Sequence, residues 1–352
     1  MKKLPFAGIA LLSAVMLSSC GIPQNTEREP VQPKTERVTV GFSQIGSESD
    51  WRMASTASIQ QAFAESPYTL LLNDGQQKQE NQIKAIREFI DQDVDYIILD
   101  PCLETGWDSA LMEAKEAGIP VIVIDREVAV EDKSLYTAWI GSDFYLEGQR
   151  AMKWLEAYLE KEGYEDGVKI VGIQGTIGAT AQIGRTRALE EAVDAHENWT
   201  LLEEQTGDYT EAKGKEVMEE YLQKYPGEIN VVYCENDNEA YGAIDAIQEA
   251  GGRVGMNIKA GDILVLSFDA THDGLKKTLE GKIAADTECS PLYGKRLVQL
   301  IDQLEQGEEP ETMTYIEEGQ FSSYSGIRAI WVVDNSYLVT RLTEEILEER
   351  EY

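Results

Sequence analysis

Residues 96–126 read YIILDPCLETGWDSALMEAKEAGIPVIVIDR, and this stretch decides the fold. Two apolar runs, 96–99 and 121–124, flank a helical pattern over 106–117. Gly118 and Pro120 mark the end of that helix and the return to an extended chain. Unbroken Val, Ile and Leu runs are typical of parallel strands in a sheet that helices cover on both faces. The stretch therefore predicts a strand-helix-strand unit of an α/β protein.

The same alternation continues on both sides of this unit. We expect further strands over residues 38–42, 69–72, 136–140, 169–173, 200–204, 229–234, 263–268 and 282–287. We expect the main helices over residues 51–65, 76–92, 144–161, 181–195, 211–224, 239–250 and 291–306. Two consecutive series of this kind predict two doubly wound parallel-sheet domains.

The N-terminal residues have the pattern of an export signal. Lys2 and Lys3 precede an apolar run over 4–17, which is too short to span a bilayer comfortably. The run ends in LSSCG at 17–21, which resembles the bacterial lipobox. We expect a signal peptide over 1–19, lipidation of Cys20 and a flexible, proline-containing tether over 20–37, so the chain would be extracytoplasmic and anchored to the cell membrane. The alternative is an ordinary signal peptide that is cut elsewhere.

Charge and cysteine content exclude several classes of function. The formal net charge of −33 argues against nucleic-acid binding and against lying flat on an anionic membrane. Cys102, Cys234 and Cys289 show no metal-ligand spacing, so we expect them to be small buried residues, and a disulfide between two of them remains an alternative. We expect no metal and no cofactor.

Polar residues follow the expected strands where each strand ends. They stand at 43–52, 125–126, 174–176, 235–237, 269, 286 and 288. Ligands of doubly wound sheets bind beyond the carboxyl ends of the strands. Carboxylates, amides and the arginine fork bond well to sugar hydroxyls, and an aromatic face such as that of Trp51 covers the apolar side of a sugar ring. Helix capping is the competing interpretation for each Asp or Asn.

Several longer motifs carry a resemblance to a known family. They are VGFSQ at 40–44, GSES at 46–49, DGQQKQENQIKA at 74–85, TGW at 105–107, DKSLY at 132–136 and GKEVME at 214–219. From 38 to 306 the chain resembles the type I periplasmic sugar-binding proteins of ABC importers, most closely those that bind galactofuranose. This resemblance implies two lobes joined by a three-strand hinge, 38–141 with 289–311 and 142–288 with 312–352. It also implies a monomer that delivers a monosaccharide to ABC transporter permease subunits.

The resemblance also implies a ligand shell. Its residues would be Glu48, Ser49, Trp51, Arg52, Asp125, Arg126, Thr176, Arg185, Asn236, Asp237, Asp269 and Glu288. Asp50, Gly184 and Glu235 depart from the family pattern, which has glycine, aspartate and histidine there, and they put the exact sugar in doubt. The segment 321–352 matches poorly, and its helix over 342–350 is expected to be a surface feature. Asp74 is expected to cap the helix that follows it.

Two other functions compete with sugar capture for transport. A glycosidase would use Asp125 and Asp269 as paired carboxylates, but a nearby arginine should keep each of them ionised, so we expect no enzyme. A sugar or signal receptor for a membrane sensor would use the same scaffold, and this alternative stays open.

Overall fold

The computed structural model describes residues 37–352, and the first of its two large sheets organises the N-terminal part of that chain. The expected signal peptide, Cys20 and nearly all of the expected tether lie outside the described residues. The sheet has the strand order β12-β5-β4-β3-β1-β2 and is parallel throughout. Its strands are β1 (Thr39–Gln44), β2 (Thr69–Asp74), β3 (Tyr96–Leu99), β4 (Val121–Ile124), β5 (Ala138–Gly141) and β12 (Met313–Tyr315).

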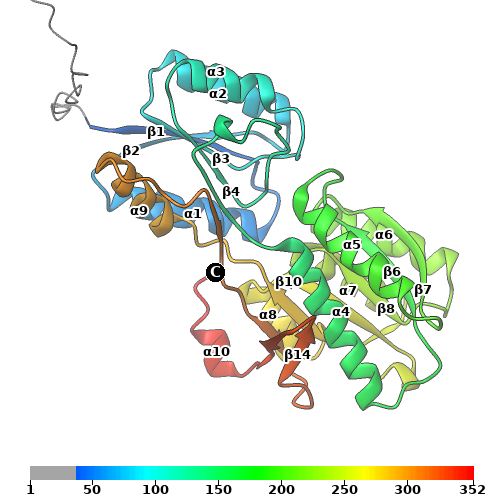
Figure 1. Ribbon diagram of the computed structural model, residues 1–352. Helices are drawn as coiled ribbons and strands as arrows, with labels where there is room; N and C mark the ends of the chain where they lie inside the picture. Colours follow the sequence, from blue (N-terminus) through cyan, green and yellow to red (C-terminus); the bar gives the residue numbers. More distant parts are fainter. Residues whose placement is uncertain (1–36) are drawn as a thin grey trace, which may run out of the picture. The chain divides into compact units, whose positions relative to one another are not determined.

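Helices cover both faces of this first sheet (Figure 1). On one face α1 (Asp50–Ala64) and α9 (Gly294–Glu305) pack on Val40, Ile98 and Ile122. On the other face α2 (Gln79–Asp91) and α3 (Asp108–Glu116) pack on Ile97, Val121 and Val123. Neighbouring residues of a strand face opposite sides, so unbroken apolar strands supply both cores. We call these elements the first lobe.

The second sheet repeats this arrangement. Its order is β16-β13-β11-β10-β8-β6-β7, with short β9 (Arg253–Val254) beside β10. The strands are β6 (Lys169–Gln174), β7 (Thr200–Thr206), β8 (Val231–Cys234), β10 (Asp262–Asp269), β11 (Ala285–Glu288), β13 (Gln320–Ser322) and β16 (Thr340–Arg341). The helices are α4 (Phe144–Lys161), α5 (Thr180–Asp194), α6 (Glu211–Lys224), α7 (Asp237–Glu249) and α8 (His272–Leu279). These elements form the second lobe, and the expected two doubly wound domains are confirmed.

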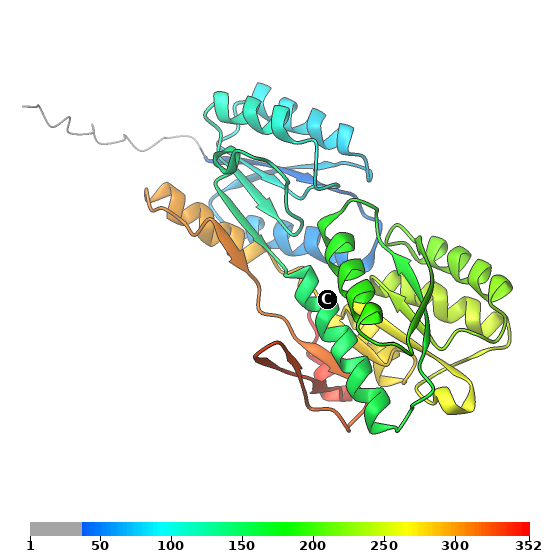
Figure 2. The same ribbon diagram turned by 45° about the vertical axis from the view of Figure 1, so that its right-hand side comes forward.

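Three segments cross between the lobes. They join β5 to α4, β11 to α9 and β12 to β13. In Figure 2 the orange segment after α9 runs from the first lobe to the second. Part of the expected division is wrong, because β12 pairs with β5 and so places Met313–Tyr315 in the first sheet, although 312–352 was assigned to the second lobe.

The C-terminal segment is more varied than the sequence indicated. After β13 come the hairpin β14 (Ala329–Val332) with β15 (Asn335–Leu338), then β16 and α10 (Glu344–Glu348). The helix expected over 342–350 is therefore shorter in the structure, where α10 spans only Glu344–Glu348. The last residues turn back to the crossing segments, where Arg350 Nη1 lies 2.8 Å from Glu288 Oε1.

Two local expectations have clear outcomes. Asp74 does not cap α2, because Lys78 holds the N-cap position and the Asp74 carboxylate accepts the backbone N–H of Gln76 in a tight turn. Cys102, Cys234 and Cys289 are buried and free, as expected for small core residues. Within residues 37–352, no helix combines the length and apolar character that a membrane span needs.

Candidate ligand-binding site

A cavity lies between the two lobes, beyond the carboxyl ends of both sheets, with about 300 Å³ of empty space when its open mouth is included. The predicted ligand residues that line it are Glu48, Ser49, Trp51, Arg52, Asp125, Arg126, Arg185, Asn236 and Asp269. The loop after β1, the first turn of α1 and the loop after β4 supply the first-lobe residues, and α5, the loop after β8 and the end of β10 supply the others.

In the first lobe, three carboxylates hold Arg52. Its Nε lies 3.1 Å from Glu48 Oε1, its Nη2 lies 3.1 Å from Asp125 Oδ2, and its Nη1 donates to Asp100. Arg52 is 3 % exposed, so these pairs form away from water. Burial raises the pKa of Asp100 well above its usual range, and the charge of Arg52 opposes that shift. The ion pairs fix the Asp125 carboxylate before any ligand arrives.

Arg126 stands beside Asp125 with part of its hydrogen-bonding capacity unused. Its Nη1 donates to the backbone oxygen of Cys102 at 2.8 Å, and its guanidinium lies 5.2 Å from the centre of the Tyr209 ring. Among the described residues, Arg126 Nε, Tyr209 Oη and Glu48 Oε2 are buried without a hydrogen-bond partner. Together these three atoms offer a donor, an acceptor and a group that is both to a polar molecule in the cavity.

In the second lobe, Arg185 is the central cation. Its Nη2 lies 2.8 Å from Glu147 Oε2 and 3.6 Å from Asp269 Oδ1, and its Nη1 donates to the backbone oxygen of Glu235. The ring of Phe268 lies under the guanidinium, 4.7 Å from centroid to Cζ. Burial raises the pKa of Asp269 well above its usual range, and the charge of Arg185 opposes that shift.

Helix capping explains two of the predicted ligand residues as well as the cavity does. Ser49 caps α1, because its Oγ accepts the backbone N–H of Arg52 at 3.2 Å. Asn236 caps α7 through its Oδ1, which accepts the N–H of Glu239 at 2.8 Å. Both residues line the cavity nonetheless, so capping also fixes two polar side chains at its wall.

Three predicted ligand residues lie outside the cavity lining. Thr176 belongs to the turn after β6, where its carbonyl accepts the N–H of Ala179. The Asp237 carboxylate bonds to Ser267 Oγ at 2.6 Å and to Thr271 Oγ1 at 2.7 Å, which ties α7 to the start of α8. Glu288 Oε1 accepts hydrogen bonds from Arg350 and Tyr352, so this oxygen is already bonded to C-terminal residues.

The lining also includes residues that the sequence did not single out, namely Phe144, Ala181, Tyr209 and Cys289. Tyr209 follows the end of β7, so the strand-end rule could have found it. Phe144 and Cys289 lie next to crossing segments, and a Phe or a Cys in the sequence does not by itself indicate a ligand-binding site. Trp51 has a second role, because its Nε1 donates to the backbone oxygen of Cys289 at 2.6 Å and joins α1 to the second crossing segment.

Comparisons with known proteins agree with this geometry. The model of the periplasmic binding protein domain matches residues 40–309. The galactofuranose-binding protein YtfQ of Escherichia coli (strain K12) is 41 % identical over 280 residues, which are 79 % of this chain and 85 % of that protein.

Two solved structures have the same fold and similar sequences. One is the binding protein of the arabinose ABC transporter from Shewanella sp. ANA-3, bound to L-arabinofuranose, with a TM-score of 0.75, 40 % identity and coverage of 81 % of this chain and 91 % of that one. The other is from Mycobacterium smegmatis in complex with β-D-fucofuranose, with a TM-score of 0.76, 39 % identity and coverage of 81 % and 91 %. The resemblance seen in the sequence is thus confirmed, and the chain belongs to the periplasmic binding protein family, with the type I fold.

Proposed function

We propose that this protein captures a monosaccharide in furanose form, galactofuranose or a close relative, outside the cytoplasm and delivers it to the permease subunits of an ABC transporter. The observation that carries the proposal is the set of unpartnered buried atoms around the cavity, Arg126 Nε, Tyr209 Oη and Glu48 Oε2. A guanidinium donates, a carboxylate accepts and a phenol does both. A ring of sugar hydroxyls can satisfy all three, because each hydroxyl is both donor and acceptor.

The remaining lining supports a sugar of modest size. Two carboxylates, Asp125 and Asp269, face the cavity from opposite lobes, and each lies beside an arginine. The rings of Trp51, Phe144 and Tyr209 supply apolar faces for ring C–H groups. Relatives of about 40 % identity are named for, or solved with, galactofuranose, arabinofuranose and fucofuranose, which favours a furanose over a pyranose ring.

Membrane attachment and delivery rest on the sequence and on the family. LSSCG at 17–21 supports lipidation of Cys20 after removal of 1–19, and 20–37 would then tether the lobes to the membrane. Mass spectrometry of the N-terminal peptide from cell envelopes should find an acylated Cys20. Neighbouring permease and ATPase genes would support delivery, whereas a neighbouring histidine kinase gene would support the receptor alternative.

Binding without catalysis is the second part of the proposal. The Asp125 carboxylate is shared by Arg52 and Arg126, whose nitrogens lie 3.1 and 3.9 Å from its Oδ2. A carboxylate fixed between two cations is a poor nucleophile and a poor proton carrier. Incubation with chromogenic galactofuranosides should release no chromophore, and any turnover that disappears in an Asp125→Asn variant would contradict this part.

The decisive experiment is calorimetry of the purified protein against a panel of sugars. The panel contains galactofuranose, arabinofuranose and fucofuranose, with galactopyranose and ribose as ring-form and size controls. We expect one furanose to bind with a stoichiometry of about one per chain and to displace the other furanoses. Absence of binding to every furanose, or preference for a pyranose, would refute the proposed ligand.

A further inference from the structure

The three crossing segments meet at one acidic side chain, Glu318. Ser142 Oγ, on the first segment, donates to Glu318 Oε1 at 2.6 Å. The backbone N–H of Ser290, on the second segment, donates to the same oxygen at 2.7 Å. Glu318 itself belongs to the third segment, so its carboxyl group ties together the parts of the chain that any hinge motion must bend.

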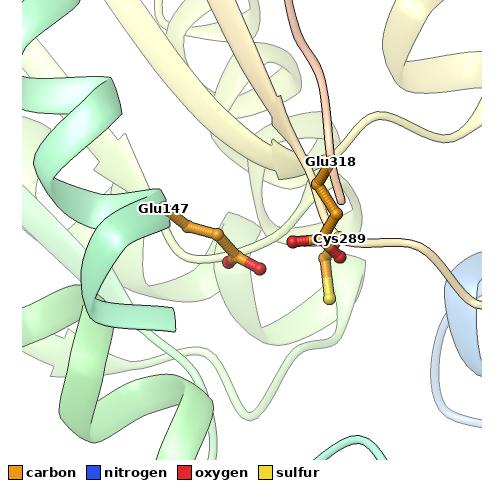
Figure 3. A group of neighbouring side chains, drawn as sticks. All are labelled: Glu147, Cys289 and Glu318. Carbon is orange, nitrogen blue, oxygen red and sulfur yellow. The ribbon is translucent and has the colours of Figure 1, made fainter. Parts of the chain in front are cut away.

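A second acid faces Glu318 from α4. One carboxylate oxygen each of Glu147 and Glu318 and the sulfur of Cys289 lie within 4.8 Å of one another. Figure 3 shows the three side chains pointing toward one another. Glu147 is 2 % exposed, and its Oε1 has no partner among the described residues, while its Oε2 holds Arg185 of the ligand cavity. The cluster therefore connects the hinge to the cavity wall.

We propose that Glu147 and Glu318 share one proton when the lobes are closed, and that this proton couples hinge closure, and with it sugar affinity, to pH. The inference rests on the proposed sugar binding for its affinity readout. Two buried carboxyl groups this close do not both ionise, and a carboxyl-carboxylate hydrogen bond is the usual resolution.

The surrounding charges assign the proton to Glu318. Burial raises the pKa of Glu318 well above its usual range, the charge of Glu147 raises it further, and the bonds from Ser142 and Ser290 oppose the shift. Burial also raises the pKa of Glu147, but the adjacent Arg185 opposes this most strongly. Glu147 is thus the carboxylate of the pair and Glu318 the acid.

The groups packed around this pair favour a proton over a metal ion. Two guanidiniums adjoin it: that of Arg185, and that of Arg150, which donates to the backbone oxygen of Glu318 at 3.0 Å. The other titratable groups that interact with the pair or with these arginines are Cys289, Glu288, Asp269, Tyr209, Tyr233, Glu235, Glu239, Tyr293 and Tyr337. A divalent cation would add charge beside two cations, whereas one proton removes a carboxylate repulsion at no such cost.

The effect of hinge opening on Glu318 determines whether sugar affinity rises or falls with pH. Bending the crossing segments would admit water to the pair, and water would return the pKa of Glu318 toward the ordinary glutamate range. At pH values between the ordinary pKa of glutamate and the raised pKa of Glu318, closure would then take up a proton. In that window sugar affinity falls as pH rises, by at most about tenfold per pH unit for one proton.

The test compares Glu318→Gln with Glu204→Gln. The amide introduced by Glu318→Gln can accept from Ser142 and Ser290 and donate to Glu147, so it imitates the protonated acid at every pH. Glu204 on β7 is a matched control, because burial raises its pKa to about 7 although it lies far from the crossing segments. We expect wild type and Glu204→Gln to lose affinity for the bound furanose to the same extent from about pH 5 to about pH 9, and Glu318→Gln to lose clearly less over that range.

A second measurement needs no variant. Calorimetry of wild type at about pH 7, in two buffers with different ionisation enthalpies, should detect uptake of up to about one proton per sugar bound. Equal pH profiles of wild type and Glu318→Gln, absence of proton uptake, or a stoichiometric metal ion found by mass spectrometry would each overturn the proposal. If no sugar binds at any pH, the proposed function fails and the coupling fails with it; if sugar binds but the two pH profiles agree, only the shared proton fails.

Discussion

At the scale of single residues, Arg126 offers the sharpest test of the cavity. It is 3 % exposed, and its Nε lies 3.9 Å from Asp125 Oδ2 without forming a hydrogen bond. Arg126→Ala should weaken furanose binding by about 2–5 kcal/mol, or about 30-fold and more, because sugar hydroxyls and part of the Asp125 charge lose their partner. Calorimetry with the furanose that binds wild type measures the change.

The matched control for this prediction is Arg87→Ala. Arg87 forms a two-pronged ion pair with Glu113 on the surface of the first lobe, far from the cavity. Exposed pairs of this kind contribute little, roughly 0–1 kcal/mol, so the control should bind sugar like wild type. An unchanged dissociation constant for Arg126→Ala would show that Arg126 does not contact the ligand.

The raised pKa of Glu235 predicts how the free energy of unfolding depends on pH. Burial raises its pKa to about 8, although Thr186 Oγ1 and the N–H of Gly175 donate to its oxygens. A carboxyl group whose pKa is raised by folding stabilises the protein below the unfolded pKa, and this contribution is lost as pH rises through the folded value. Denaturant titrations should show wild type losing up to about 3–5 kcal/mol more than Glu235→Gln between about pH 5 and pH 9.

Glu197→Gln, at an exposed position, is the control and should follow wild type. If Glu235→Gln loses as much stability as wild type over this range, Glu235 is ionised in the folded protein. The same contacts give Glu235 a role away from the cavity lining, because they join it to the loop after β6 and to the second turn of α5.

The strand-end rule brought most of its candidate residues to the cavity lining, and the exceptions have physical reasons. Asp125, Arg126 and Asp269 follow buried strands that end at the cavity, so their positions follow from the strands alone. Asp237 also follows a strand, but its helix turns the carboxylate back into the second lobe, which no local pattern records. Cys289 reaches the lining only because a crossing segment passes there.

At the scale of elements, the C-terminal segment contributes a contact that sequence patterns could not predict. The main strands were predictable because burial on both faces demands unbroken apolar runs. By contrast, β13 to β16 are short, and α10 spans Glu344–Glu348 only, so their hydrophobic periodicity is weak. What fixes the last residues is a long-range cluster in which Arg350 pairs with Glu288 and stacks over Tyr352, 3.9 Å from its ring centre.

Arg350→Ala should destabilise the second lobe. Arg350 also donates to the backbone oxygen of Ala270 at 2.8 Å, and the Arg350–Glu288 pair is mostly buried, so its loss leaves two acceptors without this donor. We expect a decrease of about 1–3 kcal/mol in the free energy of unfolding, measured with urea. Arg341→Ala, at an exposed residue of β16, should change it by less than about 0.5 kcal/mol, and equal effects of the two variants would contradict an anchoring role for the tail.

At the scale of the whole described chain, the two lobes contact each other at the mouth of the cavity. The N–H of Asp50 donates to Asn238 Oδ1 at 3.1 Å, that of Glu104 to Gly178 O at 2.9 Å, and that of Glu127 to Thr180 Oγ1 at 3.0 Å. Periplasmic binding proteins enclose their ligands by hinge motion, and these contacts belong to the closed arrangement. The contact of Asp50 with Asn238 is polar, so closure is sensitive to charge beside it.

Asp50 supplies such a charge, at a position where the family pattern has glycine. Burial raises its pKa, the charge of Asp273 across the mouth raises it further, and the bond to Asn238 opposes the shift. Asp50→Asn should tighten sugar binding by at most about 1 kcal/mol, or several-fold, because solvent screens the repulsion that it removes. The gain should shrink as salt rises, because the Debye length falls to roughly 8 Å at physiological ionic strength.

A double-mutant cycle tests whether this repulsion acts between the lobes. If Asp50 and Asp273 oppose closure through each other, Asp273→Asn should give the same gain, and the double variant should gain little more than either single variant. Asp91→Asn, at an exposed position at the end of α2, removes the same charge away from the mouth and should leave affinity unchanged. Strictly additive gains, or an equal gain from Asp91→Asn, would show that net charge rather than repulsion across the mouth sets the affinity.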